Sequence, residues 1–271
     1  MTEWPARLVL VGAGKMGGAM AQGWLDAGLP AAALTILEPS PSPEIASLAA
    51  HRGVALNPPI AAAPDMLVLA VKPQSLEQVA PQIARLAGEH TLLLSIVAGK
   101  TIANLLARLP EARAVVRAMP NTPAAIGRGV TGAFANPGVD GEQRRWCERL
   151  FSAVGAFFWL DDENAIDAVT AISGSGPAYV FAMTEALAAA AERLGLPVEL
   201  SMSLARGTVE GAAELMRRES ATSPATLRRN VTSPGGTTAA AVAVLEGPRG
   251  LNDLMARATA AARARAAEMA G

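Results

Sequence analysis

Cysteine and histidine are nearly absent from the 271-residue chain, which has one cysteine, Cys147, and two histidines. A single cysteine excludes an intrachain disulfide and the paired Cys-x-x-Cys ligands of common metal sites. The neighbours of Cys147, Trp146 and Glu148, favour a helix. We therefore expect a buried, unreactive thiol at Cys147 and no metal centre.

Excess charge and long apolar runs are also missing, and aromatic residues are scarce at 4%. The formal net charge of −1 gives no electrostatic reason to expect nucleic acid or an anionic membrane as a partner. Residues 168–184 come closest to a membrane span but contain Ser, Gly and Pro. Glu3 and Pro5 interrupt the start, so no secretory signal precedes the first apolar run. We expect a soluble, cytoplasmic protein.

The rest of the sequence is arranged around a glycine-rich loop near the start of the chain. The apolar run Leu8–Val11 stops at Gly12 and passes into a helix-period segment, residues 16–27. Gly12, Gly14 and Gly17 have the G-x-G-x-x-G spacing that joins a first strand to a first helix in dinucleotide-binding folds. A pyrophosphate would lie on free N–H groups at the helix N-terminus. The predicted cofactor loop comprises Gly12, Ala13, Gly14, Lys15, Met16 and Gly17; a glycine-rich turn without a ligand is the alternative.

The first part of the chain alternates strand and helix patterns. Apolar strand patterns cover residues 8–11, 34–37, 54–56, 66–71, 91–97, 114–119, 131–135 and 155–160. Helical patterns lie between several of them, at residues 16–27, 43–51, from 101, and 140–153. Continuous apolar runs such as residues 66–71 are typical of buried parallel strands. The pattern predicts an α/β domain of the Rossmann type over residues 1–161.

Polar side chains stand at the carboxyl ends of these strands, where open α/β sheets bind ligands. Glu38 comes about twenty residues after Gly17, the place of an acid that binds the adenosine ribose. A carboxylate there favours NADH and repels the extra phosphate of NADPH. Lys72 follows another strand, and the amide of Asn121 could meet the nicotinamide half of the cofactor. A turn-flanking acid, a surface lysine and a plain turn are the respective alternatives.

After residue 161 the strand patterns stop, and the apolar residues follow helical spacing. Residues 164–194, 198–218, 224–229, 236–245 and 251–269 all follow helical spacing and are rich in Ala, Leu and Met. These helices are apolar on more than one side, which five helices alone can hardly bury. The pattern predicts an all-helical domain over residues 162–271 and a homodimer formed through it.

Two glycine-rich segments interrupt the helical part. Residues 173–179 break into the first long helix, and close backbone packing against another helix or the nucleotide-binding domain would account for them. Residues 232–238 open a short helix. There the successive N–H groups of Gly235, Gly236 and Thr237, with hydroxyls beside them, form a pocket suited to a small carboxylate. A simple capping loop is the alternative.

The absence of lysine and histidine from the helical part limits the chemistry. No lysine follows Lys100 and no histidine follows His90. A dehydrogenase that acts on an alcohol usually needs His, Lys or Tyr to move the hydroxyl proton, and Tyr179 is the only such residue in the helical part. An imine removes that demand because its nitrogen arrives protonated near neutral pH. A hydroxyl that orients it would suffice, and Thr238 is our candidate.

Five motifs together resemble the pyrroline-5-carboxylate reductase family. They are Gly12–Gly17, Ala70–Pro73, Met119–Pro123, Ser173–Tyr179 and Val231–Thr238. The resemblance implies a Rossmann domain and a helical dimerisation domain with interlocked subunits, in many members a decamer built of dimers. It also implies hydride transfer from NADPH or NADH to the C=N carbon of 1-pyrroline-5-carboxylate, which gives L-proline.

The resemblance also implies roles for individual residues. Ser233 and the backbone of Gly235, Gly236 and Thr237 would bind the substrate carboxylate, and Thr238 would hydrogen-bond the ring nitrogen. Asn57 occupies the place of an asparagine that contacts the adenosine ribose in similar chains. The matching motifs add Ala70, Val71, Lys72, Pro73, Asn121 and Pro123 to the cofactor site. Family members that use NADPH well tend to carry a hydroxyl or another phosphate donor where this chain has Glu38, so the cofactor leans towards NADH or dual use.

Two other functions fit parts of the pattern. A β-hydroxyacid dehydrogenase shares the two-domain plan but needs a lysine in the helical part, which this chain lacks. A non-catalytic dinucleotide-binding protein would keep the glycine loop but would have no reason for the Ser233–Thr238 segment.

Overall fold

The computed structural model describes residues 4–270, which form two compact units. The first contains residues 4–175 and 262–270, and the second contains residues 176–261. The last strand ends at Trp159, close to the change in hydrophobic period at residue 161. The first unit nevertheless continues through α6 (Ala165–Val169), because this helix packs on the sheet.

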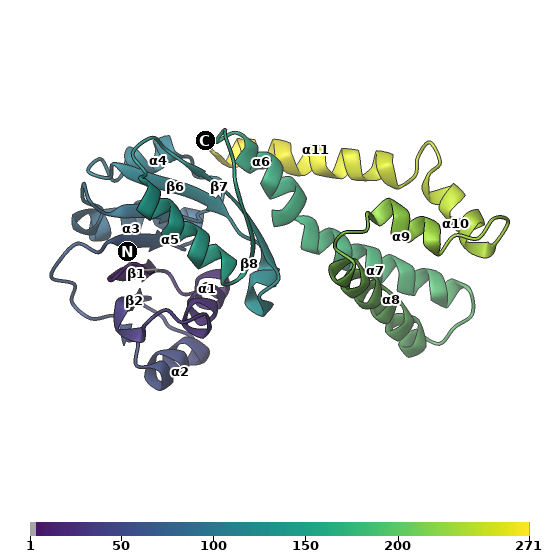
Figure 1. Ribbon diagram of the computed structural model, residues 1–271, viewed down its shortest axis with the longest axis horizontal. Helices are drawn as coiled ribbons and strands as arrows, with labels where there is room; N and C mark the ends of the chain where they lie inside the picture. The colour runs from purple at the N-terminus through teal and green to yellow at the C-terminus, as the bar shows by residue number, and fades with distance from the viewer. Residues whose placement is uncertain (1–3, 271) are drawn as a thin grey trace. The chain divides into compact units, whose positions relative to one another are not determined.

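The first unit is built on an eight-stranded sheet (Figure 1). Its strands are β1 (Leu8–Val11), β2 (Leu34–Leu37), β3 (Ala55–Leu56), β4 (Met66–Leu69), β5 (Leu92–Ser95), β6 (Ala114–Met119), β7 (Gly129–Ala135) and β8 (Gly155–Trp159). Their spatial order is β3-β2-β1-β4-β5-β6-β7-β8. The first six strands are parallel and follow the Rossmann order, whereas β7 runs antiparallel to β6 and β8 runs parallel to β7. The predicted Rossmann-type fold is confirmed.

Helices cover both faces of this sheet (Figure 1). One core lies against α1 (Lys15–Asp26), α2 (Pro43–Arg52) and α5 (Gly141–Ser152). The other lies against α3 (Leu76–Ile83) and α4 (Ile102–Leu106). Side chains alternate between the faces of a strand, so Leu8 and Leu10 enter the first core while Val9 and Val11 enter the second. This two-sided burial is why the strands read as continuous apolar runs.

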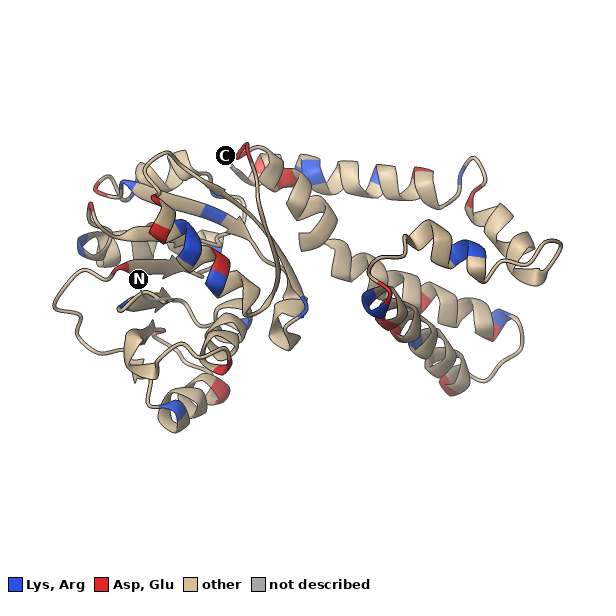
Figure 2. Cartoon of the chain, viewed as in Figure 1, with Lys and Arg blue, Asp and Glu red and all other residues tan. Residues whose placement is uncertain are grey.

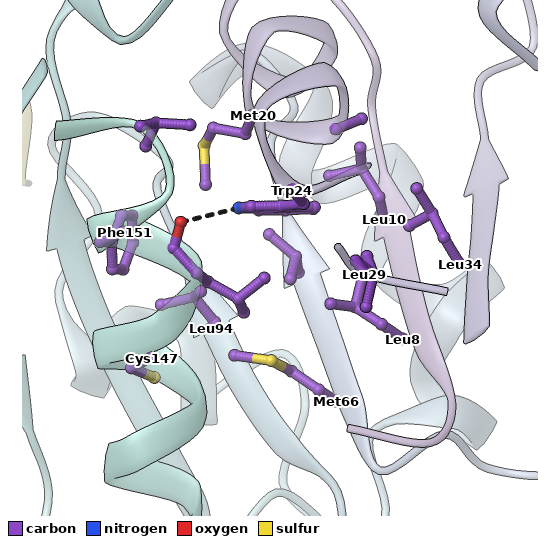
Figure 3. Close-up of a cluster of buried hydrophobic side chains, with 14 of the residues drawn as sticks. Leu8, Leu10, Met20, Trp24, Leu29, Leu34, Met66, Leu94, Cys147 and Phe151 are labelled. Carbon is purple, nitrogen blue, oxygen red and sulfur yellow. Dashed lines mark hydrogen bonds between the residues drawn. The ribbon is translucent and has the colours of Figure 1, made fainter. Parts of the chain in front are cut away.

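Trp24 lies at the centre of the first core and is fully buried (Figure 3). Its indole N–H donates to the backbone carbonyl of Leu150 at 3.0 Å, so burial leaves no indole donor unpaired. Cys147 is buried in the same core, and desolvation raises the pKa of its thiol far above the ordinary value. The expectation of a buried thiol is confirmed, and a raised pKa disfavours the reactive thiolate.

The second unit is helical. It contains α7 (Gly176–Arg193), α8 (Val198–Arg218), α9 (Pro224–Asn230) and α10 (Thr237–Leu245). Residues 251–261 of α11 (Leu251–Ala270) also belong to it. Among the described residues, no helix is long and apolar enough to cross a membrane.

Many apolar side chains of the second unit remain exposed on the single chain. Phe181 on α7 is 64% exposed and Val244 on α10 is 76% exposed. Helix α10 carries no charged side chain along its length (Figure 2). Exposed large apolar side chains in this number are typical of an association surface.

Candidate cofactor and substrate sites

The predicted cofactor residues of the first unit follow strands at one edge of the sheet. Gly12 follows β1, Glu38 follows β2, Asn57 follows β3, Lys72 comes soon after β4, and Asn121 comes soon after β6. These strands are parallel, so their carboxyl ends meet at the same edge. Residues far apart in sequence are thereby gathered where this fold class binds ligands.

The three glycines of the motif are required for different structural reasons. Gly12 has φ +90°, and a Cβ there would lie 2.7 Å from the carbonyl oxygen of Ala70. A Cβ on Gly17 would lie 2.2 Å from the carbonyl oxygen of Gly12. No atom lies within 4 Å of the position that a Cβ of Gly14 would take. Gly12 and Gly17 are thus required by the packing of the protein itself, whereas Gly14 borders open space at the start of α1.

A pocket of about 720 Å³ lies beside this loop. Its wall includes Gly14, Lys15, Gln22, Glu38, Ser40 and Glu44. The volume is within the range of small-molecule sites, and Gly14 is the N-cap of α1, whose backbone N–H groups favour a phosphate. The residues therefore fit the adenosine and phosphate half of a dinucleotide. Glu44 was not among the residues that the sequence indicated.

The carboxylate of Glu38 is turned towards the glycine loop. One oxygen accepts the backbone N–H of Ala13 at 2.9 Å, and the other accepts the N–H of Ser40 at 3.1 Å. The side chain of Asn57 makes two hydrogen bonds with the backbone of Glu38, both at 2.8 Å. Its oxygen accepts the Glu38 N–H, and its amide nitrogen donates to the Glu38 carbonyl. The structure thus joins two residues that the sequence indicated separately.

Lys72 and its neighbours form the turn after β4. The backbone N–H of Ala70 donates to the carbonyl of Val11 at 2.8 Å, which extends the pairing of β1 with β4. Val71 follows, and a short 3₁₀ turn begins at Pro73. The side chain of Lys72 is exposed at this edge. The structure thus places Lys72 in the turn at the carboxyl end of β4, the position that the sequence indicates.

Asn121 is buried, with 7% of its surface exposed. Its amide nitrogen donates to the carbonyl of Ser173 at 2.9 Å, and its oxygen accepts the N–H of Val130 at 2.8 Å. Pro123 lies in the 3₁₀ turn Thr122–Ile126 that follows. In this chain the Asn121 side chain therefore joins the turn after β6 to the start of β7 and to the segment after α6.

The predicted interruption after residue 172 is a π-helical turn, Thr170–Gly174, followed by α7. A Cβ on Gly174 would lie 3.0 Å from the terminal methyl of Met119, at the end of β6. Together with the Asn121–Ser173 hydrogen bond, this contact confirms close backbone packing against the nucleotide-binding part.

A buried ion-pair cluster near these turns was missed from the sequence. Arg117 on β6 is 4% exposed and pairs with Glu163 at 3.2 Å and Asp167 at 3.3 Å. Glu163 also accepts the backbone N–H of Ile102 at 2.8 Å. The cluster could have been predicted from the arginine inside the apolar run of β6, because a buried charge is usually paired.

The predicted substrate segment is a turn that leads into α10. The N–H of Gly236 donates to the carbonyl of Ser233 at 3.0 Å, and Gly235 has φ +70°. One of the three predicted N–H groups therefore closes the turn itself. Ser233, Thr237 and Thr238 are exposed, the last two in the first turn of α10. The N-cap of this helix is a glycine, so no side chain caps its first N–H groups.

Comparison with known proteins identifies the family. A model described as "Pyrroline-5-carboxylate reductase dimerisation" matches residues 163–269, and one described as "NADP oxidoreductase coenzyme F420-dependent" matches residues 7–99. The chain is 42% identical to pyrroline-5-carboxylate reductase of Pseudomonas aeruginosa over 97% of both chains. It is 36% identical to that of Haemophilus influenzae, again over 97% of both. This chain belongs to the pyrroline-5-carboxylate reductase family.

Solved structures agree with this assignment. The pyrroline-5-carboxylate reductase of Coxiella burnetii has a TM-score of 0.89 at 35% identity, covering 98% of this chain and 99% of that one. The Plasmodium falciparum enzyme, solved with NADP bound, has a TM-score of 0.81 at 30% identity, covering 98% of both chains. The family is one of NAD(P)-dependent oxidoreductases, so the predicted enzyme class and the predicted helical dimerisation domain are confirmed.

Membership in this family also accounts for the exposed helices. The dimerisation model spans α7 to α10 and most of α11, the region in which large apolar side chains are exposed. Oligomer formation is therefore a property of this family member. Membership also decides against the two other functions that the sequence left open, the β-hydroxyacid dehydrogenase and the non-catalytic dinucleotide-binding protein.

Proposed function

We propose that the chain reduces 1-pyrroline-5-carboxylate to L-proline, the last step of proline biosynthesis, with its substrate at the start of α10. The observation that supports this most is the exposed segment Ser233–Thr238, whose hydroxyl groups and N–H groups surround a helix N-terminus without a side-chain cap. Such an arrangement favours a carboxylate. In this proposal residues 162–271 carry substrate binding and assembly, and residues 1–161 carry the cofactor.

The proposed mechanism needs little acid–base chemistry from the protein. A bound nicotinamide supplies the hydride. Ser233 and the N–H groups of Gly235 and Thr237 hold the substrate carboxylate. Thr238 accepts a hydrogen bond from the protonated ring nitrogen and so orients the C=N carbon. The nitrogen keeps its proton in the product, so no lysine or histidine is required.

We propose that the cofactor lies across the carboxyl edge of the sheet. The loop Gly12–Gly17 would hold the pyrophosphate, with Lys72 as a nearby cation. Glu38 would accept hydrogen bonds from the ribose hydroxyls, which favours NADH or use of both cofactors. Ala70–Pro73 and the turn from Asn121 to Pro123 would form the wall at the nicotinamide half. In this proposal Asn121 acts by holding that turn.

We further propose a cytoplasmic homodimer formed through α7 to α11, with a decamer of such dimers as the larger assembly. The exposed apolar side chains of these helices support the dimer, because their burial contributes roughly 25 cal/mol per Å². Analytical ultracentrifugation measures the assembly directly. A monomer at micromolar concentration would contradict this proposal.

A spectrophotometric assay tests the reaction. Oxidation of NADH and of NADPH is followed by nicotinamide absorbance with 1-pyrroline-5-carboxylate, and reduction of NAD+ and of NADP+ is followed separately with a β-hydroxyacid. We expect turnover with the imine alone. Turnover with the hydroxyacid and none with the imine would overturn the proposal.

A further inference from the structure

Asn57 has the most unusual backbone of the cofactor edge. Among residues 4–270, it is the one non-glycine residue with positive φ, at 54°. Asparagine tolerates this left-handed conformation better than most residues. The conformation accompanies a side chain that meets both backbone polar groups of Glu38, each at 2.8 Å.

Glu38 is consequently held by four hydrogen bonds. Asn57 engages its N–H and its carbonyl, while Ala13 and Ser40 donate N–H groups to its carboxylate oxygens. Because both backbone groups and both carboxylate oxygens are engaged, the carboxylate has little freedom to turn away from the pocket. An arriving cofactor meets a carboxylate that is already in place.

A second carboxylate lines the same pocket. Glu44, in the first turn of α2, belongs to the pocket wall. The Ser42 hydroxyl donates to this carboxylate and lowers its pKa below the ordinary value, so Glu44 remains charged at neutral pH. The charged residues of the wall are thus two carboxylates and one cation, Lys15.

We propose that Asn57 is a positioning residue that sets cofactor preference through Glu38, and that Glu38 and Glu44 together select NADH. The inference rests on the proposed contact between Glu38 and the adenosine ribose. A ribose diol donates hydrogen bonds to a fixed carboxylate. The additional phosphate of NADPH carries close to two negative charges at neutral pH and meets two carboxylates at that end.

A double-variant experiment separates this role from direct ribose binding by Asn57. The dissociation constants of NADH and NADPH are measured by isothermal titration calorimetry on the full chain without substrate. The proteins are wild type, Asn57→Gly, Glu38→Ser and the double variant. Glycine adopts positive φ without strain, so Asn57→Gly removes the side chain and spares the backbone.

If Asn57 acts through Glu38, its substitution matters only while Glu38 is present. We expect Glu38→Ser to weaken NADH binding about tenfold or more and to strengthen NADPH binding. Asn57→Gly should change the ratio of the NADH and NADPH dissociation constants in the same direction by a smaller factor. In the Glu38→Ser background it should change the ratio no further. A further loss of NADH affinity in that background would overturn the proposal, since it would indicate direct contact.

Two more variants sharpen the test. Glu44→Gln removes the second charge with little change of shape, and we expect it to strengthen NADPH binding and leave NADH binding within twofold. Asn136→Ala is the matched control, because the Asn136 side chain also joins two backbone groups: it accepts the Val115 N–H at 3.0 Å and donates to the Arg113 carbonyl at 2.9 Å. These groups lie at the start of β6, at the opposite edge of the sheet. We expect this variant to lower the melting temperature without changing the ratio.

The possible failures are distinguishable. If Asn57→Gly does not fold, Asn57→Asp replaces it, because Asp keeps the acceptor for the Glu38 N–H and loses the donor to the carbonyl. An unchanged ratio in a folded Asn57 variant would overturn the positioning role. Tighter binding of NADPH than of NADH by the wild type would overturn the selection of NADH. Failure of both cofactors to bind would instead overturn the proposed cofactor site, and normal binding without imine turnover would overturn the proposed reaction.

Discussion

The two units of this chain use apolar side chains in different ways. In the first unit, helices on both faces of the sheet bury β1, β4 and β5 almost completely. In the second, large apolar side chains on α7, α8 and α10 remain exposed. The first unit closes its own core, whereas the second needs another surface to complete it, which matches the dimerisation family model over this region.

The ion pairs differ in the same way. Arg117 in the first unit pairs with two carboxylates and is buried, whereas pairs of the second unit such as Arg257 with Asp253 lie on exposed helix faces. Burial makes an unpaired charge costly, while solvent screens an exposed one. The stability of the first unit should therefore depend on its pairs far more than that of the second.

The largest expected effect comes from breaking the buried cluster. Arg117→Met leaves the partly buried Glu163 and Asp167 without their cation, and we expect a cost of about 3 kcal/mol, the lower end for removal of one partner of a buried pair. The matched control, Arg257→Met, should cost at most about 1 kcal/mol. Urea denaturation followed by far-ultraviolet circular dichroism, which reports helix loss in both units, measures both. Equal losses would contradict the contrast between the units.

The second prediction separates chemistry from cofactor binding. Thr238→Ala should lower turnover about 10²-fold or more because the ring nitrogen loses its orienting hydroxyl. Its matched control is Thr226→Ala on α9, a threonine outside the proposed site. Cofactor affinity measured by calorimetry should not change in either variant. Unchanged turnover in Thr238→Ala would remove this residue from the mechanism.

The third prediction concerns assembly. Phe181→Glu places a charge in the exposed apolar surface of α7 and should shift the oligomer towards monomer in analytical ultracentrifugation, since burial of an unpaired charge is unfavourable. Ile126, which is 77% exposed on the first unit, provides the control substitution Ile126→Glu. A similar shift in both variants would show that assembly is not restricted to the helical unit.

The smallest expected effect is a pH dependence of stability that arises from one carboxyl group on α8, Glu214. Arg217 and Arg218 lower the pKa of Glu214 to about 2 from an ordinary 4.5. A carboxyl group with a lowered pKa contributes stability above its unfolded pKa, and this contribution is lost as the pH falls from about 4.5 to about 2. The group is exposed, so the effect is small. NMR titration of the side-chain carboxyl gives the pKa, and a value near 4.5 would contradict the pairing.

The sequence predicted the elements well where periodicity was strong. All eight strand patterns are strands, and α8 to α11 have nearly the predicted bounds. The predicted helix over residues 164–194 is instead divided into α6, a π-helical turn and α7. The sequence pattern assigned no helix to α3 (Leu76–Ile83), which contains Pro81 in its interior. Proline usually opposes a helix interior, so local pattern and final structure disagree there.

The candidate site was predictable only in part. The glycine loop, Glu38 and the α10 turn carry local signals, because glycine, a strand-end acid and a cluster of hydroxyls each have a recognisable spacing. The partners of Asn57 and Asn121 had no such signal. Asn57 meets Glu38 across nineteen positions and Asn121 meets Ser173 across fifty-two, so only the folded chain brings them together.

By itself, the sequence determined the order of the strands, the glycine-rich turn between β1 and α1 and the excess of apolar surface in the helical part, because each depends on short-range spacing or on composition. Only the tertiary structure decided the antiparallel direction of β7, the burial of Arg117 with its two carboxylates and the fixed carboxylate of Glu38. These features depend on which backbone and charged groups face one another after folding, and hydrogen bonds and ion pairs form at contact distance whatever the separation in sequence.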